Sequence, residues 1–267
     1  MKDLTLSLVQ MRSILGRPDT NFKSMIDRIR NIASGGTDII CFPEASLTGY
    51  TSDRPELFSM PASDERVERI RRAAADHEVA VVFGFLEHSG LGYHVTQAVA
   101  DSEGGLDFYR KTHLGRGERT SFIPGEKIRA FHTLKAEIGV QLCWESHFPE
   151  ISCKLRKEGA ELILIPYASP IGGPRRKDIW MRYIPARAAD NCLFVAAVNA
   201  VGNGENSTFS GGGSIVFDPK GRMLGESFSE DEDVLTVNLF SKNKDALGSD
   251  ADMGNIDYFI YRREELY

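Results

Sequence analysis

Amphipathic helical segments alternate with short, continuous apolar runs along most of the chain, and this alternation restricts the fold more than any other feature. Residues 19–33 carry apolar side chains at helical spacing, and residues 64–77 repeat the pattern. The apolar runs at 4–11, 38–44 and 79–86 have the length of strands. Continuous rather than alternating apolar residues are typical of strands buried on both faces. The pattern therefore predicts a layered α/β domain.

The remaining segments refine this prediction. Further strands are expected at 93–100, 106–110, 128–133, 137–143, 161–166 and 193–199, with hairpin-like strands at 213–217, 222–227 and 233–239. Helices are expected at 147–158 and 178–191. The hairpins argue against a purely parallel sheet. Two sheets packed face to face, with helices outside each, would bury the apolar runs on both sides.

We expect one domain over residues 1–239, followed by a C-terminal tail over 240–267. The tail contains an aromatic and aliphatic cluster at 258–261 and Leu266. So many apolar groups after the last strand predict docking, either on the tail's own domain or on a partner subunit.

Composition limits the partners and the compartment. The chain has 267 residues, 42% of them hydrophobic, and a net charge of −6, which gives no reason to expect nucleic acid. The N-terminus has no signal-peptide pattern, and no apolar run approaches the ~20 residues that span a bilayer, so we expect a cytoplasmic protein without membrane contact. The four cysteines lack paired spacing, which favours neither a disulfide framework nor zinc. The glycine run at 211–213 predicts a loop or a close backbone approach.

Cys143 stands where a strand-like run ends and a helix is expected to begin, in "IGVQLCWESHFPE". Alternation along 138–143 places the thiol on the face opposite the apolar residues. Ser146 is a candidate helix cap, and Pro149 suits a first turn. The N–H groups and dipole of a helix start would favour a thiolate, although a nucleophilic cysteine also needs a base. From this segment alone, an inert buried cysteine is an equally good interpretation.

Two other segments end strands with polar groups. "ICFPEAS" delivers Glu44 and "LDFYRKTHL" delivers Lys111. Ligand sites of open α/β folds gather beyond the carboxyl ends of strands, so these groups and Cys143 could converge there. Without the other segments, Glu44 is best interpreted as a solvated or capping carboxylate, and Lys111 as a surface lysine.

The motifs taken together carry a specific resemblance. "FPEASLTGY", "YRKTHL", "FIPGE", "LCWESHFPE" and "PARAADN", in this order, resemble the nitrilase superfamily of carbon–nitrogen hydrolases over nearly the whole chain. The resemblance implies a four-layer α-β-β-α sandwich and a Glu–Lys–Cys triad, which by motif is Glu44, Lys111 and Cys143. A second glutamate that often completes such sites is best matched by Glu118 and less well by Glu126.

The resemblance also implies an activity. It predicts a hydrolase that cleaves a small amide or N-carbamoyl compound to an acid and ammonia or an amine, through a thioester on the cysteine. A nitrilase that converts a nitrile to an acid is the alternative, as is a non-catalytic interaction subunit on the same fold. No cofactor or metal is implied. The family commonly forms dimers, so a homodimer or larger homo-oligomer is expected.

Candidate substrate-binding residues surround the expected nucleophile. Trp144 and Tyr167 could supply apolar walls, although Trp144 could equally belong to the core. His147 could reach the site from the loop after Cys143, or could be an exposed residue at the helix start. Arg175 or Arg176 could bind a substrate carboxylate, but a short basic cluster is more often a solvated loop.

Overall fold

The computed structural model describes residues 1–202, 210–245 and 256–266. One sheet has the strand order β14-β1-β2-β3-β4-β5. Its strands are β1 (Leu4–Gln10), β2 (Ile39–Cys41), β3 (Ala80–Ser89), β4 (Gly92–Ala100), β5 (Leu106–Arg110) and β14 (Asp233–Leu239). β1, β2 and β3 are parallel, whereas β4 is antiparallel to both β3 and β5. β2 and β5 therefore run in the same direction, and their carboxyl ends lie at one edge of the sheet.

The second sheet has the order β13-β12-β9-β8-β7-β6. Its strands are β6 (Ala130–His132), β7 (Glu137–Val140), β8 (Leu162–Tyr167), β9 (Phe194–Asn199), β12 (Ser214–Phe217) and β13 (Met223–Ser227). The central strands β7, β8 and β9 are parallel. A short antiparallel pair, β10 (Val201–Gly202) and β11 (Ser210–Gly211), lies outside both sheets.

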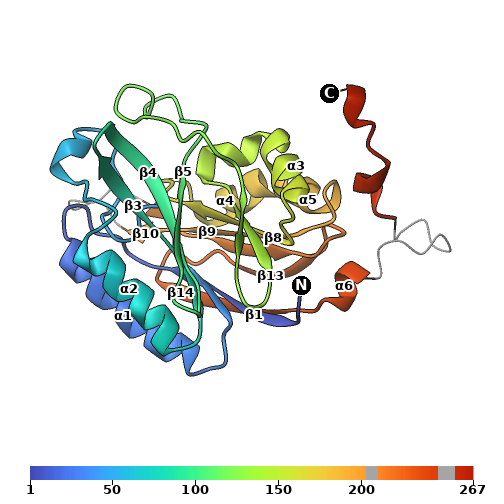
Figure 1. Cartoon of the computed structure of the whole chain (residues 1–267), viewed down its shortest axis with the longest axis horizontal. Coiled ribbons are helices and arrows are strands. Elements are labelled where there is room, and N and C mark those ends of the chain that lie inside the picture. The colour runs from blue at the N-terminus through green and yellow to red at the C-terminus, as the bar shows by residue number, and fades with distance from the viewer. Residues whose placement is uncertain (203–209, 246–255, 267) are drawn as a thin grey trace.

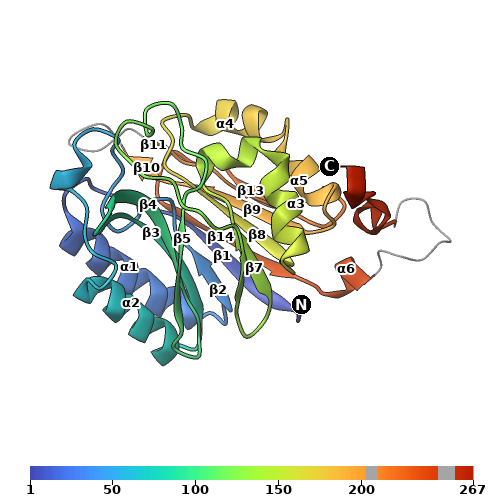
Figure 2. The same cartoon turned by 45° about the horizontal axis from the view of Figure 1, so that its top comes forward.

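Helices cover the outer face of each sheet, so the molecule has four layers (Figures 1 and 2). The first sheet is covered by α1 (Pro18–Ala33) and α2 (Glu65–Asp76). The second is covered by α3 (Pro149–Lys157), α4 (Gly173–Trp180) and α5 (Ile184–Ala189). Shorter helical segments are α6 (Lys242–Asp245), η1 (Pro55–Leu57), η2 (Cys143–His147), η4 (Tyr258–Tyr261) and η5 (Glu264–Leu266). The expected α-β-β-α sandwich is confirmed.

β8 shows why its sequence is continuously apolar. Leu162 and Leu164 face the other sheet and join the core between the sheets. Ile163 and Ile165 point to the opposite face and pack under the helices of the second sheet. Since successive side chains of a strand point to opposite faces, a strand buried on both sides has no polar face.

The sequence patterns locate most elements to within a few residues, but two expectations are wrong. The single helix expected at 178–191 is two helices, α4 and α5, separated at 181–183. Pro185 lies in the first turn of α5, where its missing N–H is tolerated, and a helix continuous from α4 would place it in the interior. The strand expected at 137–143 ends at Val140.

Described residues of the tail lie against α3. Arg156 Nη2 donates to Asp257 Oδ2 at 3.0 Å, and its guanidinium lies over the Phe259 ring. Arg262 also stacks on Phe259 and donates to Cys153 Sγ at 2.8 Å. Within the described residues, no helix is both long and apolar enough to cross a bilayer.

Candidate active site

Glu44 follows β2 on a tight turn. Pro43 lacks the N–H that would extend the strand pairing, and Ala45 adopts a left-handed conformation with φ of 51°. Strand β3 approaches this turn at Gly84, where a Cβ atom would lie 2.4 Å from the Ala45 nitrogen. Only glycine fits so close an approach. The Glu44 carboxyl is thereby held in the interior, where only 1% of the residue is exposed.

Lys111 follows β5 and reaches the same interior. Its ammonium lies 2.9 Å from Glu44 Oε1 and 2.7 Å from Glu118 Oε1, and all three side chains are buried. A buried cation is tolerated when carboxylates surround it and accept its hydrogens. The structure therefore brings together Glu44, Lys111 and Glu118, which the sequence analysis singled out.

Three further groups hold the carboxylates. The Tyr50 hydroxyl donates to Glu118 Oε1 at 2.7 Å, and the Gly115 N–H donates to Glu118 Oε2 at 2.5 Å. The Ala168 N–H, just beyond β8 of the second sheet, donates to Glu44 Oε2 at 3.1 Å. The carboxyl ends of strands from both sheets thus meet here. Sequence reasoning missed Tyr50, although it closes the "FPEASLTGY" motif that contains Glu44.

Cys143 begins the helical turn η2 rather than ending a strand. Its φ of 41° is left-handed, which is rare for a residue with a side chain. The Ser146 hydroxyl donates to the Cys143 carbonyl at 2.7 Å and does not cap α3, which begins after Phe148. The strand alternation therefore does not orient the thiol. Pro149 does occupy the first turn of α3, as expected.

Burial and charge set the proton affinities in the site. Burial raises the pKa of Glu44, and the charge of Glu118 raises it further, whereas Lys111 opposes both effects. Burial alone would lower the pKa of Lys111, but the negative charges of Glu44, Cys143 and Glu118 raise it well above its usual value. Lys111 is therefore an ammonium at neutral pH.

Burial raises the pKa of the Cys143 thiol to about 12, the Glu44 charge adds to this effect, and Lys111 opposes it. The expectation that a helix start favours the thiolate is wrong, because α3 begins beyond η2 and burial dominates. The resting thiol is protonated at neutral pH and needs a base to become a nucleophile. Glu44 and Lys111 both interact electrostatically with it.

Glu145 is the second residue that sequence reasoning missed. It is fully buried, and its carboxylate accepts hydrogen bonds from Tyr109, Thr112, His113 and Leu142. The only sequence signal was its position in "CWE", two residues after Cys143.

Aromatic side chains flank the turn that carries Cys143. Trp144 is 43% exposed, which shows that it is not a core residue. Its ring lies 5.5 Å from that of His147, which in turn lies 4.5 Å from that of Tyr183. A Cβ atom on Gly115 would lie 3.9 Å from Trp144 Cγ, so the indole sits beside the loop that carries Glu118.

The remaining substrate-binding candidates differ in position. Tyr167 is buried, and its hydroxyl lies 2.6 Å from Ser146 Oγ. Arg176 is also buried; it stacks over Tyr167 and donates to the Ile171 carbonyl and Ser169 Oγ. Arg175 is exposed.

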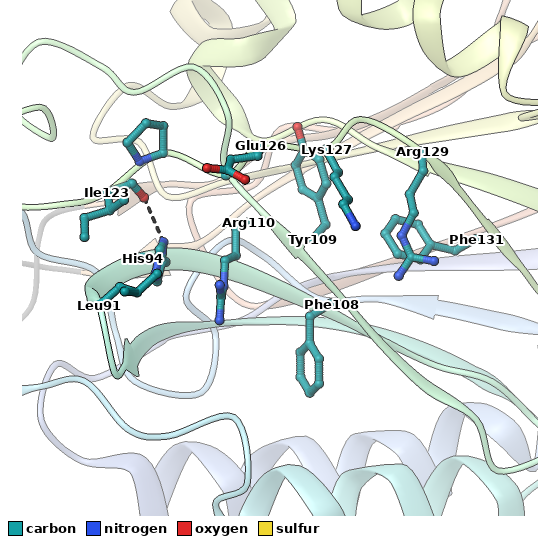
Figure 3. A pocket seen from close by; sticks show the side chains of 12 residues that line it. Leu91, His94, Phe108, Tyr109, Arg110, Ile123, Glu126, Lys127, Arg129 and Phe131 are labelled. Atoms are coloured by element: carbon teal, nitrogen blue, oxygen red, sulfur yellow. Dashed lines mark hydrogen bonds between the residues drawn. The ribbon is translucent and has the colours of Figure 1, made fainter.

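Glu126 is exposed and lines a different cavity, of about 480 Å³, between β5 and the segment that leads to β6 (Figure 3). The side chains around this cavity include Arg110 and Arg129, which pair with Glu87 and Asp107. Glu126 is not part of the cluster around Lys111. Among the described residues, no group of three or more His, Cys, Asp or Glu side chains could hold a metal ion.

The predicted glycine contact also lies near the site. A Cβ atom on Gly211 would lie 2.4 Å from the Gly172 nitrogen, so the two backbones approach closely, as expected for the run at 211–213. Asn199 bridges the same loops, because its amide donates to the carbonyls of Ser169 and Gly212.

A cysteine on the turn η2 that interacts electrostatically with a buried Glu–Lys–Glu cluster, on a four-layer sandwich, defines a cysteine-dependent hydrolase. The family model for carbon-nitrogen hydrolases matches residues 5–243, and the chain belongs to that family.

Similar proteins support this assignment. An (R)-stereoselective amidase of Pseudomonas sp. is 32% identical over 228 residues, which are 84% of this chain and 81% of the relative. A nitrilase of Pyrococcus abyssi is 27% identical and covers 98% of both chains. A solved cysteine-to-alanine mutant of the Nesterenkonia AN1 amidase, from the nitrilase superfamily, has a TM-score of 0.83, 26% identity, and covers 98% of this chain and 95% of its own. Another structure of that amidase, 25% identical with a TM-score of 0.81 and the same coverage, carries the acetamide moiety of fluoroacetamide on its active-site cysteine.

Proposed function

We propose that the protein hydrolyses a small amide or N-carbamoyl compound, with Cys143 as nucleophile, Glu44 as general base, and Lys111 and Glu118 as substrate-orienting groups. The observation that carries this proposal is the buried Lys111 ammonium between Glu44 and Glu118, electrostatically coupled to the thiol. A cluster this costly to bury is expected at a site that performs acid–base chemistry.

The reaction divides into two halves. Glu44 takes the proton of Cys143 as sulfur bonds to the substrate carbonyl carbon, and Lys111 stabilises the charge on the carbonyl oxygen. Glu44 then gives that proton to the leaving nitrogen, the carbon–nitrogen bond breaks, and a thioester remains on Cys143. In the second half, water attacks the thioester carbon while Glu44 takes a proton from that water. The carbon–sulfur bond breaks, the acid leaves, and the proton returns to the thiol.

The protonated thiol fits this sequence. With a pKa of about 12, Cys143 is not a nucleophile until Glu44 removes its proton. Glu44, with its pKa raised by burial, is a stronger base than an ordinary carboxylate. The covalent adduct on the cysteine of the Nesterenkonia amidase supports the same nucleophile here.

The exposed Trp144 and His147 form an aromatic wall with the half-buried Tyr183, and we propose this wall as the surface that receives the apolar part of the substrate. Burial, Arg187 and Arg176 lower the pKa of His147, so the wall carries no imidazolium charge at neutral pH. Tyr167 supports the turn η2 through the hydrogen bond between its hydroxyl and the Ser146 hydroxyl. Arg176 is engaged with the 169–171 loop, so we assign it to loop positioning rather than to a substrate carboxylate.

The test is ammonia release from a panel of primary amides, N-carbamoyl compounds and the matched nitriles. We expect turnover of at least one amide or carbamoyl compound, an acyl adduct on Cys143 by mass spectrometry, and no turnover by Cys143→Ala. Turnover of nitriles but not of their amides would identify a nitrilase instead, as in the Pyrococcus relative. No turnover of any compound, or an adduct on another residue, would refute the assignment.

Assembly and location are further proposals. Tyr258, Ile260 and Tyr261 are 59–66% exposed although their side chains are largely apolar. Such exposure of neighbouring apolar groups favours a homodimer or larger homo-oligomer that covers them. Sedimentation of the protein and of a Tyr258→Ser/Tyr261→Ser variant would test this.

We also propose a cytoplasmic location, which fractionation of the source cells would check.

A further inference from the structure

We propose that Glu145 is a positioning residue that holds the segments of Lys111 and Cys143 at a fixed separation. Glu145 is the third residue of η2, and none of it is exposed. Its Oε2 accepts from the Leu142 N–H at 2.7 Å, the residue just before the nucleophile. This bond closes the turn on itself, as a glutamate at the third position of a helix does when it returns to the backbone.

The other oxygen binds the lysine segment. Oε1 accepts from the Thr112 N–H and the Thr112 hydroxyl, both at 2.7 Å, and from the His113 N–H at 3.1 Å. Thr112 directly follows Lys111. The Tyr109 hydroxyl, at the end of β5, adds a bond of 2.8 Å to the same oxygen. In Figure 3, the Tyr109 ring points to the side of β5 opposite Phe108, away from α1 and α2.

One carboxylate therefore joins segments that leave β5 of the first sheet and β7 of the second. It holds a turn whose first residue, Cys143, has a strained backbone with φ of 41°. Such strain persists only where the surroundings overdetermine it. Without the carboxylate, the turn can relax and Lys111 can shift relative to the thiol. A misplacement of about 1 Å in an active site costs on the order of a hundredfold in rate.

The described partners of the Glu145 side chain are all donors. Glutamine has the same size but replaces one acceptor oxygen with an amide that donates, so an N–H would face other N–H or O–H groups. Glu145→Gln therefore changes the hydrogen bonds of this side chain while it keeps the side chain's size and packing. Glu87 offers a matched control, because it is also a buried carboxylate and accepts from Thr96 and Arg110.

The inference rests on the proposed function, but one of the measurements that test it, the alkylation rate of Cys143, does not require any turnover of substrate. We would measure kcat and KM on the best amide, the thermal unfolding midpoint, and the rate at which iodoacetamide alkylates Cys143, located by mass spectrometry. For Glu145→Gln we expect kcat to fall about 10- to 100-fold per folded molecule, with KM changed less than about threefold. The alkylation rate should change by more than about fivefold. Glu87→Gln should keep kcat and the alkylation rate within about twofold, even if it unfolds at a lower temperature.

A folded Glu145→Gln protein with kcat and alkylation within about twofold of the unmodified protein would overturn the proposal. So would losses of kcat that Glu87→Gln reproduces. If Glu145→Gln does not fold, Thr112→Val and Tyr109→Phe each remove one donor; kcat should fall at least about threefold in each, and unchanged kcat in both would overturn the proposal. If the unmodified protein turns over no amide, the proposed function fails, and the alkylation comparison alone decides on Glu145.

Discussion

The Lys111 ammonium lies 2.7 Å from the Glu118 carboxylate, and both side chains are almost completely buried. Glu44 accepts from the same ammonium at 2.9 Å. One cation therefore compensates two carboxylates that water does not reach. The stability of the site and its proton affinities depend on this arrangement.

Lys111→Met should abolish activity and destabilise the protein by about 3–5 kcal/mol at neutral pH, because two buried carboxylates lose their partner. The loss should shrink as the pH falls, since protonation of Glu44, whose pKa is raised by burial, removes one of the two buried charges. Urea unfolding at several pH values measures this. Lys154→Met, at an exposed ion pair with Glu158, should cost less than about 1 kcal/mol. An equal loss in the two variants would show that the buried cluster has no special role.

Glu118→Gln should shift the acid limb of the kcat/KM profile to lower pH. The proposed mechanism requires the base form of Glu44, so kcat/KM is expected to fall as the pH drops through the pKa of Glu44. The Glu118 charge raises that pKa, and its removal should lower it, even if the variant is slower overall. The profile on one amide measures the shift, with the exposed Glu126→Gln as a control that leaves the limb in place. A shift to higher pH would contradict the assignment of Glu44 as base.

Gly84→Ala should reduce kcat about 10- to 100-fold, because the new Cβ atom would lie 2.4 Å from the Ala45 nitrogen and push the Glu44 turn aside. Overpacking of this kind also costs about 1–3 kcal/mol of stability. Gly90→Ala, at the far end of the same hairpin, meets nothing within 4 Å and should be neutral within about 0.5 kcal/mol. Comparable activity in the two variants would mean that the Glu44 turn tolerates displacement.

The sequence predicted what depends on local pattern. The strands, their exits and the three polar residues at those exits follow from apolar periodicity, from Pro43 and from the family motifs. The positions of the strand ends in the sequence do not predict which polar groups come into contact. Glu44 and Lys111 are 67 positions apart, and their contact depends on the order of strands in the sheet. Pro185 did signal the break between α4 and α5, and the interpretation overlooked it.

Other features were beyond sequence reasoning for physical reasons. The raised pKa of Cys143 depends on the burial of the thiol in the folded chain and on the charge of Glu44, which lies 99 positions away in the sequence. The partners of Glu145 come from two sheets, so no local pattern reveals them. Tyr50 likewise reaches Glu118 across 68 positions of sequence.

Arg176→Ala should destabilise the protein by about 1–3 kcal/mol, because the buried guanidinium binds the 169–171 loop and stacks on Tyr167. Arg175→Ala, at the exposed neighbour, should change stability by less than about 0.5 kcal/mol. Thermal unfolding of both variants measures the difference. If Arg176→Ala instead keeps full stability and loses only substrates with a distal carboxylate, Arg176 binds substrate.

Trp144→Ala should weaken the binding of amides with a large apolar acyl group and leave small amides nearly unaffected. The indole is exposed and directly follows Cys143 in the chain, so its ring can contact a substrate without any rearrangement of the core. Loss of one aromatic contact of this kind costs about 1–2 kcal/mol, or roughly a 5- to 30-fold rise in KM. KM for a series of primary amides of increasing acyl length measures the effect. Leu91→Ala, which removes an exposed apolar side chain from the separate cavity, is the control and should leave the series unchanged. A uniform change of KM across the series in Trp144→Ala would show that the indole shapes the turn around Cys143 rather than the substrate surface.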